Sequence, residues 1–136
     1  WSRQVMDKLY QATPDGYCGD EDNGQTSAWY VFSAMGFYPV CPGTDQYVLG
    51  APLFKKATLT FENGKQMVIN AANNSDKNIY IRALKMNGQN LTRNYLTHSE
   101  LQKGGQILLE MQSTPNKERG TKESDFPYSM STKEMK

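Results

Sequence analysis

The spacing of hydrophobic residues predicts helices in the first part of the chain. Trp1, Val5 and Leu9 recur every four positions, which predicts an amphipathic helix over residues 1–11 that ends before Pro14. Residues 25–38 contain no charged side chain and place hydrophobic residues on every face of a helix. This pattern predicts a second helix that is buried on all sides.

The second helix is too apolar to be covered by the one other helix that the chain predicts. Its large side chains include Trp29, Phe32 and Met35. Such a surface is normally buried against another part of a protein. We therefore expect further polypeptide to cover this helix, and we expect the isolated chain to form homo-oligomers or aggregates through it.

After residue 42 the hydrophobic spacing changes to a period of two, which is typical of strands. Residues 57–71 alternate around an Asn63-Gly64 turn, and residues 78–95 alternate around an Asn87-Gly88 turn. Both stretches predict antiparallel hairpins with type I′ turns, in which both central residues have positive φ. In the second hairpin, residues 91–96 are expected to form the returning strand.

The remaining patterns predict a short helix, a last strand and a tail. The sequence THSE at residues 97–100 predicts a capping box that starts a helix of one or two turns. Alternation over residues 107–111 predicts a last strand. Beyond Pro115 the chain is mostly polar, and its few hydrophobic residues lie between residues 126 and 130. This tail is expected to be either disordered or packed on another surface through these hydrophobic residues.

Together these elements predict an α+β fold with three regions. We expect two or three helices and an acidic loop in residues 1–50, and antiparallel hairpins or a small β-sandwich in residues 51–115. Residues 116–136 are expected to form the polar tail. The amphipathic pattern starts at the first residue, with no leader sequence before it, so we expect the chain to continue a longer polypeptide.

Composition and charge argue against several classes of function. The 136 residues include 15 Lys and Arg against 14 Asp and Glu, which gives a formal net charge of +1. Binding to nucleic acid or to a membrane surface is therefore not favoured. No run of apolar residues is long enough to span a membrane. Cys18, Cys41 and His98 are too few for a zinc site or a disulfide framework.

The candidate chemistry lies in the string GDEDNGQ at residues 19–25. In an extended loop Asp20 and Asp22 project to the same side and Glu21 to the other. Two carboxylates that face one spot can bind a hard cation or activate a water molecule as a general base. The alternative is a solvated turn whose last acids cap the following helix. A calcium-binding EF-hand is excluded, because Val31 stands where its bidentate Glu is required.

The sequence around this loop resembles the exo-acting, calcium-dependent α-mannosidases of glycoside hydrolase family 92. The strings GDEDNGQTSAWYVFSAMGFYPVCPGT at residues 19–44 and YVLGAPLF at residues 47–54 carry the resemblance, which continues through both predicted hairpins. It implies a longer enzyme with an N-terminal β-sandwich and an (α/α)6 barrel. Residues 1–50 would then form the last helices and the active-site loop of that barrel.

The resemblance also implies roles for two residues. Asp22 aligns with the acid that acts as general base on the attacking water in an inverting reaction. Asp20 stands where the family often has Asn, so it is expected to assist the base, to bind calcium, or to do neither. The general acid, a Glu, and most calcium ligands would lie upstream. The chain alone is therefore expected to be inactive.

The resemblance further implies a substrate and a cellular location. The substrates would be glycans with terminal α-linked mannose, for which α-1,2 linkage is the first expectation. The complete enzyme would be periplasmic, attached to the cell surface or secreted. Two other functions remain open. The hairpin-rich second half fits a non-catalytic carbohydrate-binding or structural β-module, and the apolar helix fits an interaction domain.

Overall fold

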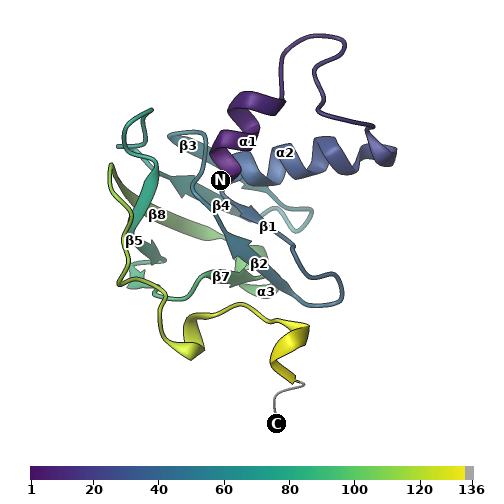
Figure 1. Cartoon of the computed structure of the whole chain (residues 1–136). Coiled ribbons are helices and arrows are strands. Elements are labelled where there is room, and N and C mark those ends of the chain that lie inside the picture. The colour runs from purple at the N-terminus through teal and green to yellow at the C-terminus, as the bar shows by residue number, and fades with distance from the viewer. Residues whose placement is uncertain (134–136) are drawn as a thin grey trace.

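The computed structural model describes residues 1–133, with helices at the N-terminus and two β-sheets behind and below them (Figure 1). The predicted α+β fold is confirmed. The helices are α1 (Ser2–Leu9), α2 (Gln25–Met35) and α3 (His98–Gln102), with short 3-10 turns η1 (Asp22–Gly24), η2 (Glu123–Asp125) and η3 (Met130–Lys133). None of the helices in the described residues is long and apolar enough to cross a membrane.

The strands form one sheet of three strands and one of five. The first has the order β1-β2-β7 and is antiparallel. Its strands are β1 (Phe37–Tyr38), β2 (Gln46–Leu49) and β7 (Tyr95–Thr97). The second has the order β3-β4-β8-β5-β6. Its strands are β3 (Lys56–Thr60), β4 (Gln66–Asn70), β5 (Tyr80–Met86), β6 (Gln89–Asn90) and β8 (Gly105–Gln112).

The larger sheet is mixed, whereas the alternation predicted only antiparallel hairpins. Strand β8 pairs parallel with β4 and antiparallel with β5. The chain reaches this central position after β7 and α3, and its alternate residues Ile107, Leu109 and Met111 are buried. Strand β8 lies between the two hairpins and joins them into one sheet.

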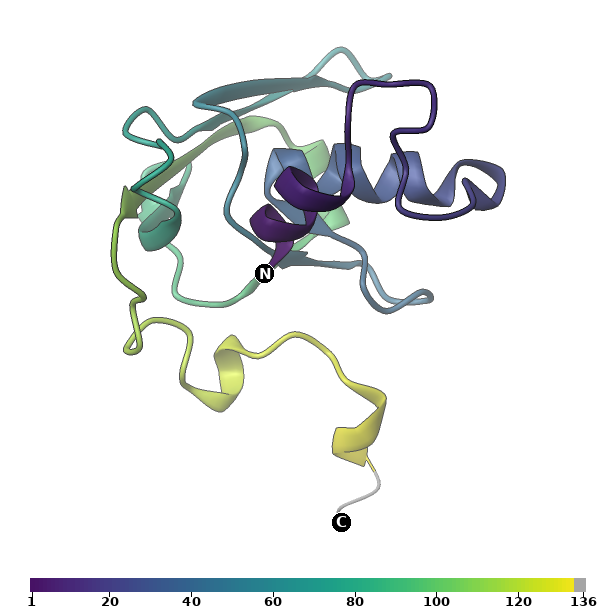
Figure 2. The same cartoon turned by 45° about the horizontal axis from the view of Figure 1, so that its top comes forward.

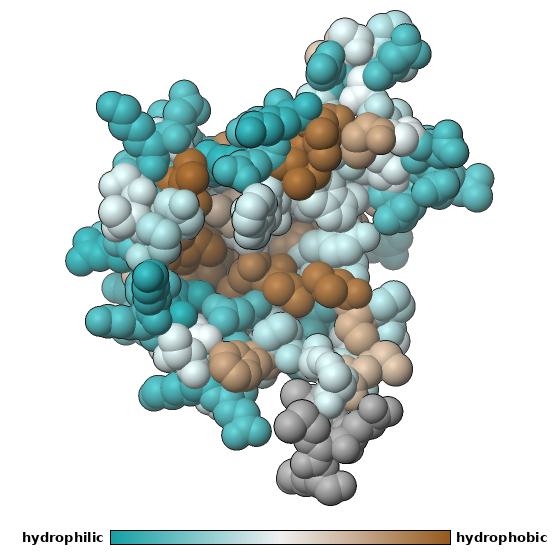
Figure 3. All heavy atoms as spheres, viewed as in Figure 1, coloured by the Kyte–Doolittle hydropathy of each residue, from teal (hydrophilic) through white to brown (hydrophobic). Residues whose placement is uncertain are grey.

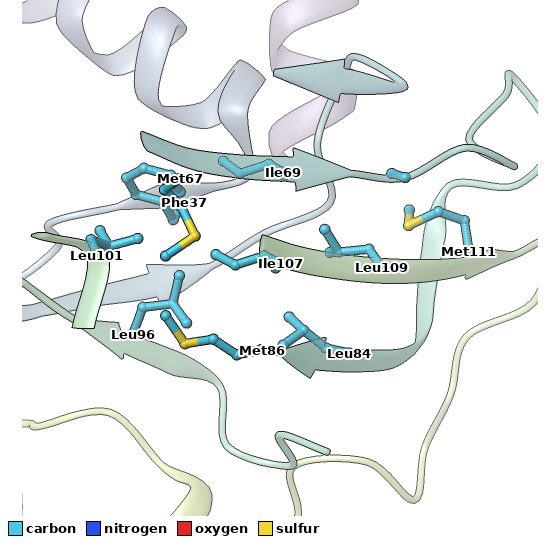
Figure 4. Close-up of a cluster of buried hydrophobic side chains, with 11 residues drawn as sticks. Phe37, Met67, Ile69, Leu84, Met86, Leu96, Leu101, Ile107, Leu109 and Met111 are labelled. Atoms are coloured by element: carbon cyan, nitrogen blue, oxygen red, sulfur yellow. The ribbon is translucent and has the colours of Figure 1, made fainter. Parts of the chain in front are cut away.

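The hydrophobic core lies on the inner face of the five-stranded sheet (Figure 4). Buried residues of β4, β5 and β8 meet Phe37, Leu96 and Leu101, which come from β1, β7 and α3. On each of these long strands the buried positions alternate with more exposed ones, as a half-buried sheet requires. The core thus depends on segments from both sheets.

The two hairpin turns differ. At the second turn, Asn87 and Gly88 both have positive φ, 50° and 83°, which confirms the predicted type I′ geometry. At the first turn only Gly64 is left-handed, with φ 76°, so the prediction of type I′ is wrong there. The Asn63 side chain accepts a hydrogen bond from the Lys65 amide at 2.9 Å and donates one to the Gln102 carbonyl at 3.2 Å. These bonds hold Asn63 in a different, three-residue turn.

The returning strand of the second hairpin is shorter than predicted. Within the predicted returning segment only β6 pairs with β5, and residues 95–97 instead pair with β2 in the smaller sheet. Residues of the tail take the place of a strand partner here. Arg119 donates hydrogen bonds to the Leu91 and Arg93 carbonyls at 3.2 and 2.8 Å, and these carbonyls no longer need a strand partner.

The described part of the tail packs on the rest of the chain. Besides Arg119, the buried Asp125 accepts a hydrogen bond from the Thr92 hydroxyl at 2.7 Å. Phe126 and Met130 remain exposed. The described tail therefore packs on the chain through Arg119 and Asp125, whereas Phe126 and Met130 of the hydrophobic cluster that was expected to pack stay exposed. Residues 134–136 lie outside the described residues.

Helix α2 is joined to the sheets at its C-terminal end. The Leu53 amide donates to the Ala34 carbonyl at 2.9 Å, and the Gly50 amide donates to the Gly36 carbonyl at 2.8 Å. Arg3 of α1 donates to the Pro52 carbonyl and, at 2.7 Å, to the Asn74 side chain. The opposite end of α2, with η1, projects beyond the sheets (Figures 1 and 2).

Within the described chain α2 is not buried on all sides. Only Ser33 and Ala34 are buried in this helix, and the Val31 side chain is 55% exposed. Figure 3 shows hydrophobic residues open to solvent in the area of α1 and α2. The helix is therefore not buried on all sides in the chain by itself, which confirms the expectation that this chain alone leaves it partly uncovered.

The predicted capping box is present at α3 and leads to a test of pH dependence. The Thr97 hydroxyl accepts from the Glu100 amide, and the Glu100 carboxylate accepts from the Thr97 amide. Arg93 contacts both Glu100 oxygens at 2.5 Å. Burial opposes ionisation of Glu100, but these hydrogen bonds and the Arg93 charge outweigh it and lower its pKa.

Because its pKa is lowered on folding, ionised Glu100 stabilises the fold above its ordinary pKa of 4.5, and this contribution is lost as the pH falls through the folded-state pKa. We predict that Glu100→Gln weakens the fall in the free energy of unfolding between about pH 7 and pH 3, measured by urea unfolding. Glu110→Gln, in the exposed ion pair with Arg82, is the control and should have little effect. An unchanged pH dependence in Glu100→Gln would contradict the prediction.

Candidate active-site loop

The acidic loop has an unusual backbone. Asp22, Asn23 and Gly24 are consecutive and all have positive φ, at 51°, 57° and 97°. Asp and Asn are the residues other than Gly that tolerate this conformation best. The chain then enters α2 directly at Gln25. The sequence DNG therefore favours a tight left-handed turn at the start of this helix.

Hydrogen bonds attach the backbone of the loop to the first turn of α2. The Glu21 carbonyl accepts from the Gly24 and Thr26 amides, both at 3.2 Å, and the Glu21 carboxylate accepts from the Ser27 amide at 3.2 Å. The Thr26 hydroxyl donates to the Asp20 carbonyl at 2.9 Å. The first amides of a helix have no partner within the helix, so these bonds satisfy groups that would otherwise be open.

The side chains of Asp20 and Asp22 do not bind the first turn of α2. Both residues are exposed, and their carboxylates make no hydrogen bond or ion pair with the residues that the structure describes. The alternative reading of the sequence, in which the acids cap the following helix, therefore holds for Glu21 alone. The two aspartates remain available to a water molecule, a sugar hydroxyl or a cation.

The loop does not form a complete metal site by itself. Within residues 1–133 no group of three or more His, Cys, Asp or Glu side chains could hold a metal ion. The Asp20 carboxylate has the type of oxygen that calcium binds, but calcium takes six to eight such ligands. The described residues can therefore supply only part of a calcium coordination sphere.

Aromatic residues hold the preceding loop over the start of α2. Tyr10 stacks on Trp29 with ring centroids 5.7 Å apart, and its hydroxyl donates to the Thr26 carbonyl at 3.3 Å. The Tyr17 and Ser27 hydroxyls lie 2.8 Å apart. Burial, followed by the nearby Cys18 and Glu21, raises the pKa of Tyr10, so this hydroxyl stays protonated and remains a donor. A groove of about 350 Å³ opens beside Tyr10 and Tyr17.

The sequence pattern gives no signal for the role of these tyrosines. Tyr10 directly follows the amphipathic stripe of α1, and Tyr17 stands next to Cys18, so nothing separates them from ordinary core residues. The other polar candidates lie apart from the loop. His98 is exposed and its Nδ1 lies 2.9 Å from the Tyr47 hydroxyl. Cys18 and Cys41 are both free thiols.

Comparison with known proteins identifies the family. The model of the glycosyl hydrolase family 92 catalytic domain matches residues 1–113. The chain belongs to this family, which confirms the resemblance drawn from the sequence.

The solved structures similar to this chain include two mannosidases of Bacteroides thetaiotaomicron. The family GH92 inverting mannosidase BT2199 is 62% identical, with a TM-score of 0.89, over 96% of this chain and 18% of its own. The family GH92 alpha-mannosidase BT3965 is 37% identical, with the same TM-score and the same coverage.

A curated relative from the fungus Arthroderma benhamiae is described as an uncharacterized secreted glycosidase. It is 29% identical over 124 residues, which are 89% of this chain and 16% of the relative. The chain thus spans about a sixth of the length of the proteins that it matches.

The open face of α2 generates a prediction about self-association. We expect the isolated chain to elute as a species larger than a monomer in size-exclusion chromatography with light scattering, because the apolar face around Val31 is uncovered. Val31→Glu should shift the chain toward the monomer. Val40→Glu is the control, since Val40 is 61% exposed but lies outside α2, and it should leave the size unchanged. A monomeric wild-type chain would contradict the prediction, since the open face would then not drive association.

Proposed function

We propose that this chain is part of an inverting α-mannosidase and that Asp22 is its general base. The family is that of the matched catalytic domain, and two of the similar structures are named as mannosidases, one of them inverting. The observation that carries the assignment to Asp22 is its position. Its carboxylate is exposed and unpartnered within the described residues, on a left-handed turn whose backbone is hydrogen-bonded to α2.

This arrangement suits a base. An inverting glycoside hydrolase uses one carboxylate to deprotonate the attacking water and a separate carboxylic acid to protonate the leaving oxygen, about 6.5–9.5 Å apart. A base must keep a free oxygen for the water proton, and a fixed backbone keeps that oxygen in place. Asp22 meets both conditions. We assign the acid to a Glu in an upstream segment, so the chain alone should not hydrolyse mannosides.

Asp20 is proposed to support the same site. Its carboxylate is exposed two residues before Asp22, and its carbonyl is fixed by Thr26. It either assists the base or provides one ligand for calcium, whose other ligands lie upstream. When bound, calcium would polarise the 2- and 3-hydroxyls of the mannose and favour distortion of the ring. Within this chain, Asp20 adds negative charge beside the base.

The proposed substrates are glycans such as mannans and N-glycans with terminal α-linked mannose, α-1,2 linkage being the first candidate. The complete enzyme is proposed to act outside the cytoplasm, in the periplasm, at the cell surface or after secretion. The description of the fungal relative as secreted supports this location. The upstream polypeptide is the proposed partner of the open face of α2.

A carbohydrate-binding β-module is less well supported. Such a module would expose aromatic rings on its sheet, whereas the outer face of the five-stranded sheet has the Arg82–Glu110 ion pair, with Tyr80 at one strand end. The aromatic contacts of the described residues gather instead around α2 and the smaller sheet. This distribution favours a half active site over a sugar-binding sheet.

We predict that Asp22→Asn in the complete enzyme lowers kcat on an α-mannoside by about 10²–10⁴ while changing KM little, because Asn tolerates the left-handed backbone but cannot accept the water proton. Asp20→Asn should have a smaller effect, since the family often has Asn there. Steady-state kinetics of both variants measure this.

The matched control for these variants is Asp15→Asn, an exposed loop aspartate outside the acidic string, which should leave kcat unchanged. Near-normal kcat in Asp22→Asn would assign the base elsewhere. Turnover by the isolated chain would show that no upstream acid is needed.

A further inference from the structure

Glu21 is built into the fold, unlike the two aspartates beside it. It is partly buried, and its Oε1 accepts the Ser27 amide hydrogen bond at 3.2 Å. Its Oε2 is closed off from solvent and has no hydrogen-bond partner among the described residues. Burying a carboxylate oxygen without a hydrogen-bond partner destabilises the fold, and such groups are rare in proteins. Its presence beside the candidate base therefore suggests a function for Glu21. Both carboxylate oxygens of Glu21 are thus taken up by the protein, one by a hydrogen bond and one by enclosure.

Glu21 also controls the backbone of the loop. Its carbonyl accepts from the Gly24 and Thr26 amides, so carbonyl and carboxylate together bind three amides around the start of α2. The negative charge lies next to the positive end of the helix dipole, which favours this arrangement. The segment that contains Asp22 is thus closed between Glu21 and the helix.

The closed segment is the strained part of the loop. Asp22 and Asn23 are both left-handed although neither is glycine. Such conformations persist only where the surrounding structure holds them, and they gather at functional sites. Without the bonds to Glu21, the loop could relax to right-handed or extended backbone, which would move the Asp22 carboxylate.

We propose that Glu21 is a positioning residue that fixes the left-handed turn presenting Asp22, and that it acts on hydrolysis only through Asp22. This inference rests on the proposed role of Asp22 as the general base. In this proposal the Glu21 carboxylate positions the loop and the Asp22 carboxylate takes the proton from water. Glu21 itself touches neither the substrate nor the water.

The test uses two variants of the complete enzyme with opposite properties. Glu21→Gln keeps the length of the side chain and an oxygen for the Ser27 amide but loses the charge, whereas Glu21→Asp keeps the charge but is too short. We expect Glu21→Gln to retain most of kcat. Glu21→Asp should lower kcat by about 10- to 100-fold with little change in KM, as a displaced catalytic group does.

A double-mutant cycle tests whether the effect passes through Asp22. In the Asp22→Asn background, adding Glu21→Asp should cost less than about 2-fold in kcat, because the group that it displaces no longer accepts a proton. Asp15→Glu, a length change at an exposed loop acid, is the control and should be neutral. Thermal unfolding of each variant shows whether the fold is kept.

The outcomes separate this inference from the proposed function. Full kcat in Glu21→Asp, together with loss of turnover in Asp22→Asn, would overturn the positioning role and leave the base assignment intact. If Glu21→Gln lowered kcat as much as Glu21→Asp, the positioning role would also be overturned. The charge of Glu21 would then matter as much as the length of its side chain. Near-normal kcat in Asp22→Asn would overturn the proposed function itself.

Discussion

The position of α2 depends on a close contact between two backbone segments at Gly36. This residue is left-handed, with φ 96°, and a Cβ at this position would lie 3.1 Å from both the Gly50 oxygen and the Pro52 nitrogen. The absence of a side chain allows the amide of Gly50 to bind the Gly36 carbonyl. The end of the helix is thereby fixed to the segment that leads into the larger sheet. The direction of α2, and with it the place of the acidic loop at the other end, follows from this contact.

In the acidic loop at the N-terminal end of α2, the backbone is held by hydrogen bonds whereas the aspartate side chains are open. The carbonyls of Asp20 and Glu21 are bound by groups of the first helical turn, whereas the Asp20 and Asp22 carboxylates are exposed and unpartnered within the described residues. A rigid backbone with open carboxylates is the arrangement that general base catalysis requires. The open face of α2 agrees with a site completed by more polypeptide. The chain spans only about a sixth of the length of the proteins that it matches, and these proteins contain further polypeptide.

Local patterns in the sequence were sufficient for much of the fold. Helix periodicity, the Asn87-Gly88 turn and the THSE capping box all act within a few residues, and each is found as predicted. Long-range pairing was not predictable, because alternation does not show that β8 lies between β4 and β5. Nor could the pattern show that Arg119 would bind the carbonyls of Leu91 and Arg93.

The candidate site was located from the sequence by its three adjacent acids and by the family resemblance. The different task of Glu21 was not visible, because it depends on where one carboxylate oxygen meets the Ser27 amide after folding. The role of the tyrosines that hold the preceding loop was not predictable either, because Tyr10 follows α1 and stacks on Trp29 of α2 only in the folded chain. The extended-loop geometry assumed for the acids also gave way to a left-handed turn.

In the proposed mechanism Asp22 takes the proton from the attacking water. Azide needs no base, so it can replace the water in a variant that lacks this side chain. In Asp22→Gly, glycine suits the left-handed backbone and leaves space for the anion. The decisive measurement is turnover of an α-mannoside by this variant of the complete enzyme in the presence of azide. Restored turnover with formation of the β-configured mannosyl azide is the predicted result. An absence of rescue in the folded variant, or an α-configured product, would contradict the account.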